Sequence, residues 1–247
     1  MDAPVSLEQA WSAAPPPAPA LRPETLARLP PSARLYLAHA LPPGAPLPRA
    51  ARLRSHGAIK LKHWWPFTAE QVIVWGRGFL WHAAVRMYGL PVRGGDWLWD
   101  GAGGMRWRWL GLLPLVNAAG PDLARSAAGR LHLESLWLPS ALASDAVQWT
   151  EPAPGQLRAR LAAHGEATEL AFALAPNGGL RSVIAPRWGN PGGGPFAYLP
   201  FGALVEAEAC FDGFTLPSRL RAGWHCGTDR FAQGEFFRVT LDAARFR

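Results

Sequence analysis

The stretch GDWLWDGAGGMRWRW, residues 95–109, decides the fold of this chain. Tryptophans alternate with other residues on both sides of a glycine-rich centre, and a period of two is typical of β-strands. We therefore predict an antiparallel hairpin with residues 100–104 as its loop. Pairing Trp99 with Met105 places Trp97 opposite Trp107 and brings Trp109 onto the same face. A slip of one residue would scatter these side chains over both faces, so the register can be tested.

Similar patterns extend along most of the chain. Helical spacing predicts helices at 24–29, 31–41 and 122–136, the last with Asp122 as its N-cap. Alternation predicts strands from residue 52 to 88, paired around 76–78, and again from 157 to 241. The chain thus combines two strand-rich halves with helices before and between them.

The two cysteines are not expected to form a disulfide. Asp212 and Gly213 form a good two-residue hairpin turn, which places Cys210 opposite Thr215. Cys226 then lies roughly 35 Å further along the strand at about 3.3 Å per residue. A disulfide needs Cα atoms within about 7 Å.

Composition excludes several classes of protein. The chain has 247 residues, of which 49% are hydrophobic and 17% charged, too apolar for a disordered polyelectrolyte. No apolar run reaches the roughly 18 residues of a membrane span, and the N-terminus lacks the shape of a signal peptide, so we predict a cytoplasmic location. Five prolines between positions 15 and 23 indicate a flexible Pro-rich tail over 1–23, followed by a single domain over 24–247.

The net charge of +7 suggests an acidic partner, but the arginines are dispersed and argue against nucleic acid. A surface that binds anions through Lys60, Lys62, Arg106 and Arg108 stays open as an alternative. It would bind with a steep salt dependence.

No motif for catalysis, a metal or a cofactor is present. The glycine-rich residues 101–104 lead into a strand, whereas a phosphate-binding loop leads into a helix. His132 and Glu134 would point about 200° apart on a helix, and neither belongs to a zinc-binding pattern. Glu206 lies opposite Arg219 in the predicted hairpin, which favours a cross-strand ion pair over acid–base chemistry.

Six blocks of sequence together carry a family resemblance. They are WWPFTAEQ at 64–71, GAGGM at 101–105, ESLWLP at 134–139, Trp149, GFTLPSR at 213–219 and GEFF at 234–237. From residue 24 to 247 the chain resembles an uncharacterised bacterial family, domain of unknown function 6544, and this resemblance implies no activity. In its order of strands and helices it is similar to the Lol-type lipoprotein carriers and receptors. That likeness implies a curved sheet wrapped around helices and an apolar cavity, although Lol-type proteins are exported.

We predict an α+β fold, a curved and mainly antiparallel half-barrel with helices packed on its concave aromatic face. The tryptophans carry too much apolar area to remain exposed on a soluble protein. Non-catalytic binding of a lipid or other hydrophobic small molecule is the leading hypothesis. Its candidate residues are Phe79, Trp81, Trp97, Trp99, Trp107, Trp109, Trp137 and Arg187. The alternatives are an enzyme acting on an apolar substrate, with His132, Glu134 or Arg187 at the mouth of the site, and an interaction protein with a fully packed core.

Overall fold

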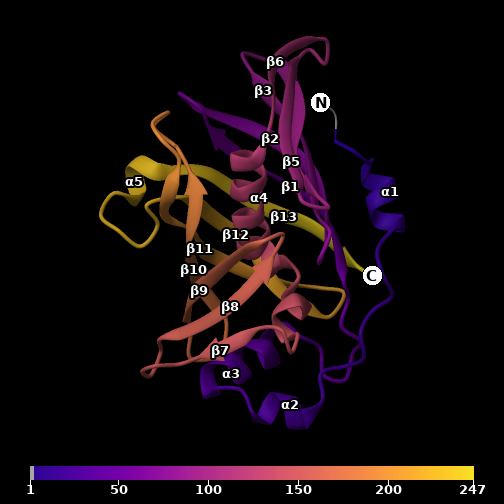
Figure 1. Cartoon of the computed structure of the whole chain (residues 1–247), viewed down its shortest axis with the longest axis vertical. Helices are drawn as coiled ribbons and strands as arrows, with labels where there is room; N and C mark the ends of the chain where they lie inside the picture. The colour runs from indigo at the N-terminus through magenta and orange to yellow at the C-terminus, as the bar shows by residue number, and fades with distance from the viewer. Residues whose placement is uncertain (1–2) are drawn as a thin grey trace.

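Residues 3–247 are described by the computed structural model, and they form one curved antiparallel sheet of 13 strands with helices against both faces (Figure 1). The order across the sheet is β6-β5-β4-β3-β2-β1-β13-β12-β11-β10-β9-β8-β7. The first six strands are β1 (Ala50–Lys60), β2 (Trp64–Val74), β3 (Gly78–Met87), β4 (Leu90–Trp99), β5 (Ala102–Trp109) and β6 (Leu113–Ala119). The other seven are β7 (Gln148–Thr150), β8 (Leu157–Ala163), β9 (Glu166–Leu174), β10 (Leu180–Gly189), β11 (Ala197–Phe211), β12 (Phe214–Trp224) and β13 (Glu235–Phe246). The predicted fold class is confirmed.

The sheet consists of two meanders joined at their ends. Within each meander, neighbours in sequence are neighbours in the sheet, and β1 pairs with β13 to join the two. The edge strands β6 and β7 flank helix α4 (Pro121–Leu133) in sequence, so the chain must return from one edge of the sheet to the other. Figure 1 shows α4 crossing the concave side of the sheet on that path. Two 3-10 helices, η1 (Glu134–Trp137) and η2 (Pro139–Ala143), complete the return.

The remaining helices lie near the N-terminus and between β12 and β13. They are α1 (Leu7–Ser12), α2 (Pro23–Ala27), α3 (Pro31–Ala40) and α5 (Phe231–Gly234). Helices α2, α3 and α4 occupy the predicted segments, although α4 ends three residues early and Gly120 takes the N-cap position expected for Asp122. No helix in the described part of the chain is long and apolar enough to cross a membrane.

The predicted register of the tryptophan hairpin is wrong. Trp99 pairs with Ala102 and Trp97 with Gly104, because Asp100 and Gly101 alone form the turn, both at positive φ. This differs from the predicted pairing by three residues. Since an odd shift exchanges the faces of one strand, Trp97 and Trp99 lie on the face opposite to Trp107 and Trp109.

Gly103 and Gly104 belong to strand β5 instead of the loop, and packing explains both. A Cβ on Gly103 would lie 2.5 Å from the Cα of Ala124 in α4. A Cβ on Gly104 would lie 2.5 Å from the indole of Trp97. The glycine-rich sequence therefore allows close packing of a helix and an aromatic ring on the strand.

The two faces of the sheet carry separate hydrophobic cores. The concave core packs against α3, α4, η1 and η2. The smaller convex core joins Trp97, Trp99 and Leu80 to Ala10 of α1. Of the segment expected to be a tail, residues 3–14 thus contribute to the core on the outer face, with Ala10 fully buried. Residues 1 and 2 of the predicted tail lie outside the described residues.

Two other hairpins confirm or refine the sequence analysis. Cys210 lies opposite Thr215 around the Asp212-Gly213 turn, and both cysteines are free thiols, as predicted. In the β2–β3 hairpin, Ile73 pairs with Phe79 instead of Trp81. That shift of two residues leaves every side chain on its predicted face.

Candidate ligand-binding cavity

A cavity of about 140 Å³ lies between the concave face of the sheet and the α4–η1 segment. Its lining comes from strands of both meanders and is mostly apolar. The apolar residues include Ile59 of β1, Trp81 of β3, Leu136 and Trp137 of η1, Phe201 and Ala203 of β11, Leu220 and Ala222 of β12, and Phe236 and Phe237 of β13. Trp137 is fixed in place because its Nε1 donates to the carbonyl oxygen of Pro217 at 3.1 Å.

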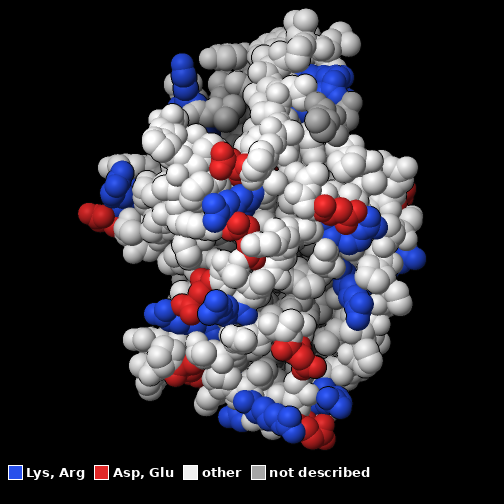
Figure 2. Space-filling model, viewed as in Figure 1, with Lys and Arg blue, Asp and Glu red and all other residues white. Residues whose placement is uncertain are grey.

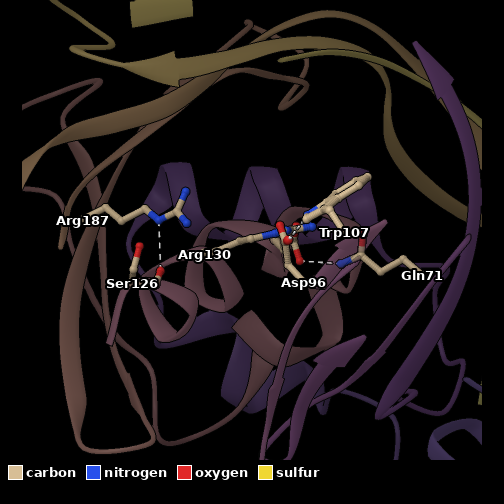
Figure 3. Close-up of polar contacts among 7 residues, drawn as sticks. Gln71, Asp96, Trp107, Ser126, Arg130 and Arg187 are labelled. Carbon is tan, nitrogen blue, oxygen red and sulfur yellow. Dashed lines mark hydrogen bonds and ion pairs between the residues drawn. The ribbon is translucent and has the colours of Figure 1, made fainter. Parts of the chain in front are cut away.

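One wall of the cavity carries a largely buried polar cluster (Figure 3). Arg130 donates from Nε to Glu134 Oε1 at 2.6 Å and from an NH group to Asp96 Oδ2 at 3.1 Å. Gln71 donates to the other oxygen of Glu134 at 2.5 Å, and the Trp107 indole N–H donates to Asp96 at 3.3 Å. Both carboxylates therefore have two donors each, which is the condition for keeping a charge in an apolar interior.

The Arg130 guanidinium also lies over aromatic rings. It is 4.5 Å from the ring centroid of Phe79 and 5.2 Å from that of Trp81. Because Arg130 and Glu134 are four residues apart on one side of the helical segment, they reach the cavity together.

Arg187, on β10, is the second arginine of the cavity and is held differently. Its Nε donates to the backbone carbonyl of Ser126 at 3.0 Å, and its guanidinium stacks 4.5 Å from the centroid of Phe201 and 5.4 Å from that of Trp224. No carboxylate forms an ion pair with it within residues 3–247. Figure 3 shows its guanidinium and that of Arg130 on the same side of α4, with Arg187 outside the cluster.

Burial lowers the pKa of Arg187 to about 10, and the positive charge of Arg130 contributes to the same shift. The guanidinium stays protonated at neutral pH. Glu134 and Asp96 attract the guanidinium through space and oppose this shift, but neither forms an ion pair with it. Arg187 is therefore a half-buried cation without a bound carboxylate among the described residues, an arrangement that an incoming anion would stabilise.

The structure brings some predicted site residues together and separates others. Trp81, Trp137 and Arg187 line the cavity. Phe79 and Trp107 support it from behind, through Arg130 and Asp96, and Trp109 packs at the margin of the same core. Trp97 and Trp99 lie on the convex face and do not reach the cavity.

The sequence analysis missed Asp96, Arg130 and Gln71. The predicted register had placed Asp96 opposite Arg108 on the outer face, and this is wrong: Asp96 pairs with Met105 and points inward. The i,i+4 spacing of Arg130 and Glu134 was the available signal for the cluster. Glu206 does pair with Arg219, at 3.1 Å, so the predicted ion pair is confirmed, although a shift of register places Ala207 and not Glu206 opposite Arg219.

His132 does not contribute to the cavity. It is fully buried on another side of α4, and neither ring nitrogen has a hydrogen-bond partner among residues 3–247. Burial, reinforced by the charge of His164, lowers its pKa to about 4. The enzyme hypothesis required His132, Glu134 and Arg187 to converge, and the last two do so without His132. No group of three or more metal-ligating side chains occurs in the described range.

The model of a protein family described as a family of unknown function, DUF6544, matches residues 19–236. The chain belongs to this family. No curated protein matches this DUF6544 chain.

This DUF6544 protein is similar to three solved structures at very low sequence identity. A DUF1329 family protein from Desulfovibrio piger has a TM-score of 0.41 and 8% identity, with 81% of this chain and 86% of that chain covered. A putative outer membrane lipoprotein-sorting protein domain from Vibrio parahaemolyticus has a TM-score of 0.40 and 11% identity over 80% and 85% of the two chains. A LolA superfamily protein from Nitrosomonas europaea has a TM-score of 0.38 and 9% identity over 80% and 84%.

Proposed function

We propose that this protein binds a small amphipathic molecule, with the apolar part in the cavity and an anionic group at Arg187. One observation carries the proposal: an apolar cavity contains an arginine that lacks an anionic partner among the described residues. Binding sites for small molecules typically combine apolar walls with a few convergent polar groups.

The size of the cavity limits the ligand. A volume of about 140 Å³ is close to that of an apolar protein cavity that takes up benzene, and it is below the roughly 300–1,000 Å³ of drug-sized pockets. We infer that the cavity holds a single ring or a short stretch of alkyl chain. A longer lipid would extend past the cavity or move η1 away from the sheet.

The carboxylates of the cluster favour an anion at Arg187 and not at Arg130. Arg130 already binds Asp96 and Glu134, whereas the two terminal nitrogens of Arg187 remain available as donors. A carboxylate, sulfonate or phosphate on the ligand would accept charge-assisted hydrogen bonds there. The cytoplasmic location inferred from the sequence stays a prediction.

Calorimetric titration with octanoate and octanol tests the proposal. We expect both to bind, octanoate more tightly. Arg187→Met keeps the length of the side chain and should weaken octanoate roughly 10- to 100-fold, the value of one or two charged hydrogen bonds, while octanol is unaffected.

A second variant separates binding from folding. Ala203→Leu fills the cavity and should abolish binding of both compounds without lowering the melting temperature, because the added side chain enters existing space. Native mass spectrometry of the purified protein should show a co-purifying small molecule. If neither compound binds and nothing co-purifies, the proposal is wrong and the packed-core alternative gains support.

A further inference from the structure

Three hairpin turns of the first meander meet at one end of the sheet. They connect β1 to β2, β3 to β4 and β5 to β6, and because β1 to β6 are consecutive antiparallel neighbours, alternate turns lie at the same end. We call this end the hairpin tip and define it as residues 61–63, 88–90 and 110–116. It lies at the top of Figure 1, near the labels of β3 and β6.

Exposed apolar side chains concentrate at the hairpin tip. It contains eight of the ten exposed large hydrophobic residues in the described part of the chain: Leu61, Tyr88, Leu90, Leu110, Leu112, Leu113, Leu115 and Val116. Leu112 is 78% exposed and Tyr88 75%. Soluble proteins rarely gather so many apolar side chains at one place without a partner.

The turns themselves depart from ordinary turn chemistry. Tyr88 and Leu110 precede a glycine and have φ of 51° and 53°, a conformation that bulky residues rarely adopt. At the same position in other hairpins of this sheet the chain uses Asp100, His164 and Asp212, residue types that tolerate positive φ better. At both turns of the tip, a bulky apolar residue stands where Asp or Asn would adopt the backbone conformation with less strain. Such departures from local preference are expected at functional surfaces.

The positive charge of the protein lies beside these side chains. Residues 57–69, 83–95 and 101–121 contain six Lys and Arg and no Asp or Glu. The other 19 Lys and Arg of the chain are offset by all 18 Asp and Glu, so nearly the whole net charge of +7 belongs to these three segments. On the face shown in Figure 2, the described residues at this end of the molecule are blue and white, without red.

Most of these basic side chains also lack ionic partners. Within residues 3–247, no acidic side chain pairs with Lys60, Lys62, Arg86, Arg93 or Arg108. Elsewhere in the sheet, Arg52, Arg158 and Arg219 each hold a carboxylate. A pocket of about 400 Å³ between β2, β3 and β4 also places Arg86 and Arg93 beside the turn at Gly89.

We propose that the hairpin tip docks the protein on an anionic lipid bilayer. The apolar side chains would enter the interface, and the ring of unpaired Lys and Arg would contact lipid phosphates. The rings of Trp65 and Tyr88 are in contact, with 4.7 Å between their centroids. In the docked protein they would lie at the membrane–water boundary, which aromatic side chains favour. This inference does not rest on the cavity or its ligand.

Shape and charge favour a bilayer over a protein partner. The exposed apolar residues project from separate turns, and none of them lines the pocket beside Gly89. Strand β6 is a free edge, but Pro114 lacks the N–H that pairing with a second copy would use. An anionic bilayer needs only protruding apolar side chains and flexible basic ones.

Flotation with lipid vesicles tests this inference. We expect the full chain to bind vesicles of phosphatidylcholine and phosphatidylglycerol, and to bind pure phosphatidylcholine far less. Binding should weaken as salt is raised, because exposed charges are screened. No binding to the mixed vesicles would overturn the proposal.

Two pairs of variants locate the surface. Arg93→Gln with Arg108→Gln should lower the partition coefficient about 25-fold, at roughly fivefold per basic residue. Arg160→Gln with Arg181→Gln removes the same charge from exposed positions of the second meander and should have little effect. An equal loss in both pairs would mean general charge attraction and overturn docking through the tip.

A third comparison tests the apolar contribution. Leu112→Ser with Leu113→Ser should weaken binding about tenfold or more, whereas Leu35→Ser, an exposed leucine of α3, should not. Sedimentation velocity and RNA gel shifts complete the test. If the protein is a dimer that the Leu112 and Leu113 changes abolish, the hairpin tip is a contact between two copies of the chain. If the protein binds RNA but not vesicles, and the Arg93 and Arg108 changes abolish that binding, the partner is RNA. Either result would overturn docking on a bilayer.

Discussion

Gly129 of α4 and Arg187 of β10 approach so closely that a Cβ on Gly129 would lie 3.0 Å from the Arg187 Cγ. A glycine in the middle of a helix costs about 1 kcal/mol relative to alanine. Here it leaves space for the stem of the arginine that crosses the helix to reach the Ser126 carbonyl. The position of the Arg187 charge in the cavity thus depends on a glycine at position 129 of α4.

Substitutions at Gly129 should separate these two effects. Gly129→Ala should change the free energy of unfolding little, because the gain in helix propensity offsets the close approach. Gly129→Leu should destabilise by about 1–3 kcal/mol through overpacking and weaken octanoate by displacing Arg187. Urea denaturation and calorimetry measure both quantities. Unchanged stability and octanoate affinity in Gly129→Leu would show that Arg187 does not need this space.

The corrected hairpin register makes a second prediction. Gly103→Ala should destabilise the protein by about 1–3 kcal/mol, because its Cβ would meet the backbone of Ala124 in α4. In a five-residue loop the same change would be tolerated. Gly192→Ala is a matched control, since Gly192 lies in a loop with open space around it. Equal melting temperatures for the two variants would contradict the register of β4 and β5.

This hairpin also shows why the sequence predicted the fold better than the site. Period-two alternation identified the strands, and the Asp212-Gly213 turn placed Cys210 opposite Thr215. The run of glycines after Asp100 has two possible causes, a long loop or close packing against α4, and only the position of α4 distinguishes them. The residues around Gly103 alone give no information on its contact with Ala124, which lies about 20 residues later in the chain.

The same limit explains the polar cluster. Asp96, Arg130 and Arg187 come from β4, α4 and β10, and their proximity depends on the path of α4 across the concave face. The sequence grouped Trp81, Trp137 and Arg187 as candidate site residues, and all three line the cavity. It placed Trp97 and Trp99 there as well, because the run of glycines was interpreted as a long loop although Asp100-Gly101 carries the same two-residue turn signal as Asp212-Gly213.

A third prediction concerns the charge balance of the cluster. Arg130→Met should destabilise by about 1–3 kcal/mol at neutral pH, since it leaves the buried Glu134 and the half-buried Asp96 without their shared cation. The exposed pair of Arg158 and Glu169 is the control, and Arg158→Met should cost less than about 1 kcal/mol. Chemical denaturation compares the two. Equal losses would mean that the cluster is as well solvated as the surface.

A final prediction follows from His132, which the fold keeps neutral. Burial lowers its pKa from 6.5 to about 4. Between pH 6.5 and pH 4 the unfolded chain therefore binds a proton that the folded chain does not. The free energy of unfolding should decrease as the pH falls below about 6.5, by about 2 kcal/mol between pH 7 and pH 5, and this loss should level off below pH 4. His132→Leu should remove that part of the acid sensitivity. It should also raise the free energy of unfolding at pH 7, because two buried ring nitrogens without partners disappear.

Denaturant titrations at several pH values, with His63→Gln on an exposed turn as control, measure both effects. An unchanged acid-dependent loss in His132→Leu would show that His132 is protonated as easily in the folded protein as in the unfolded chain.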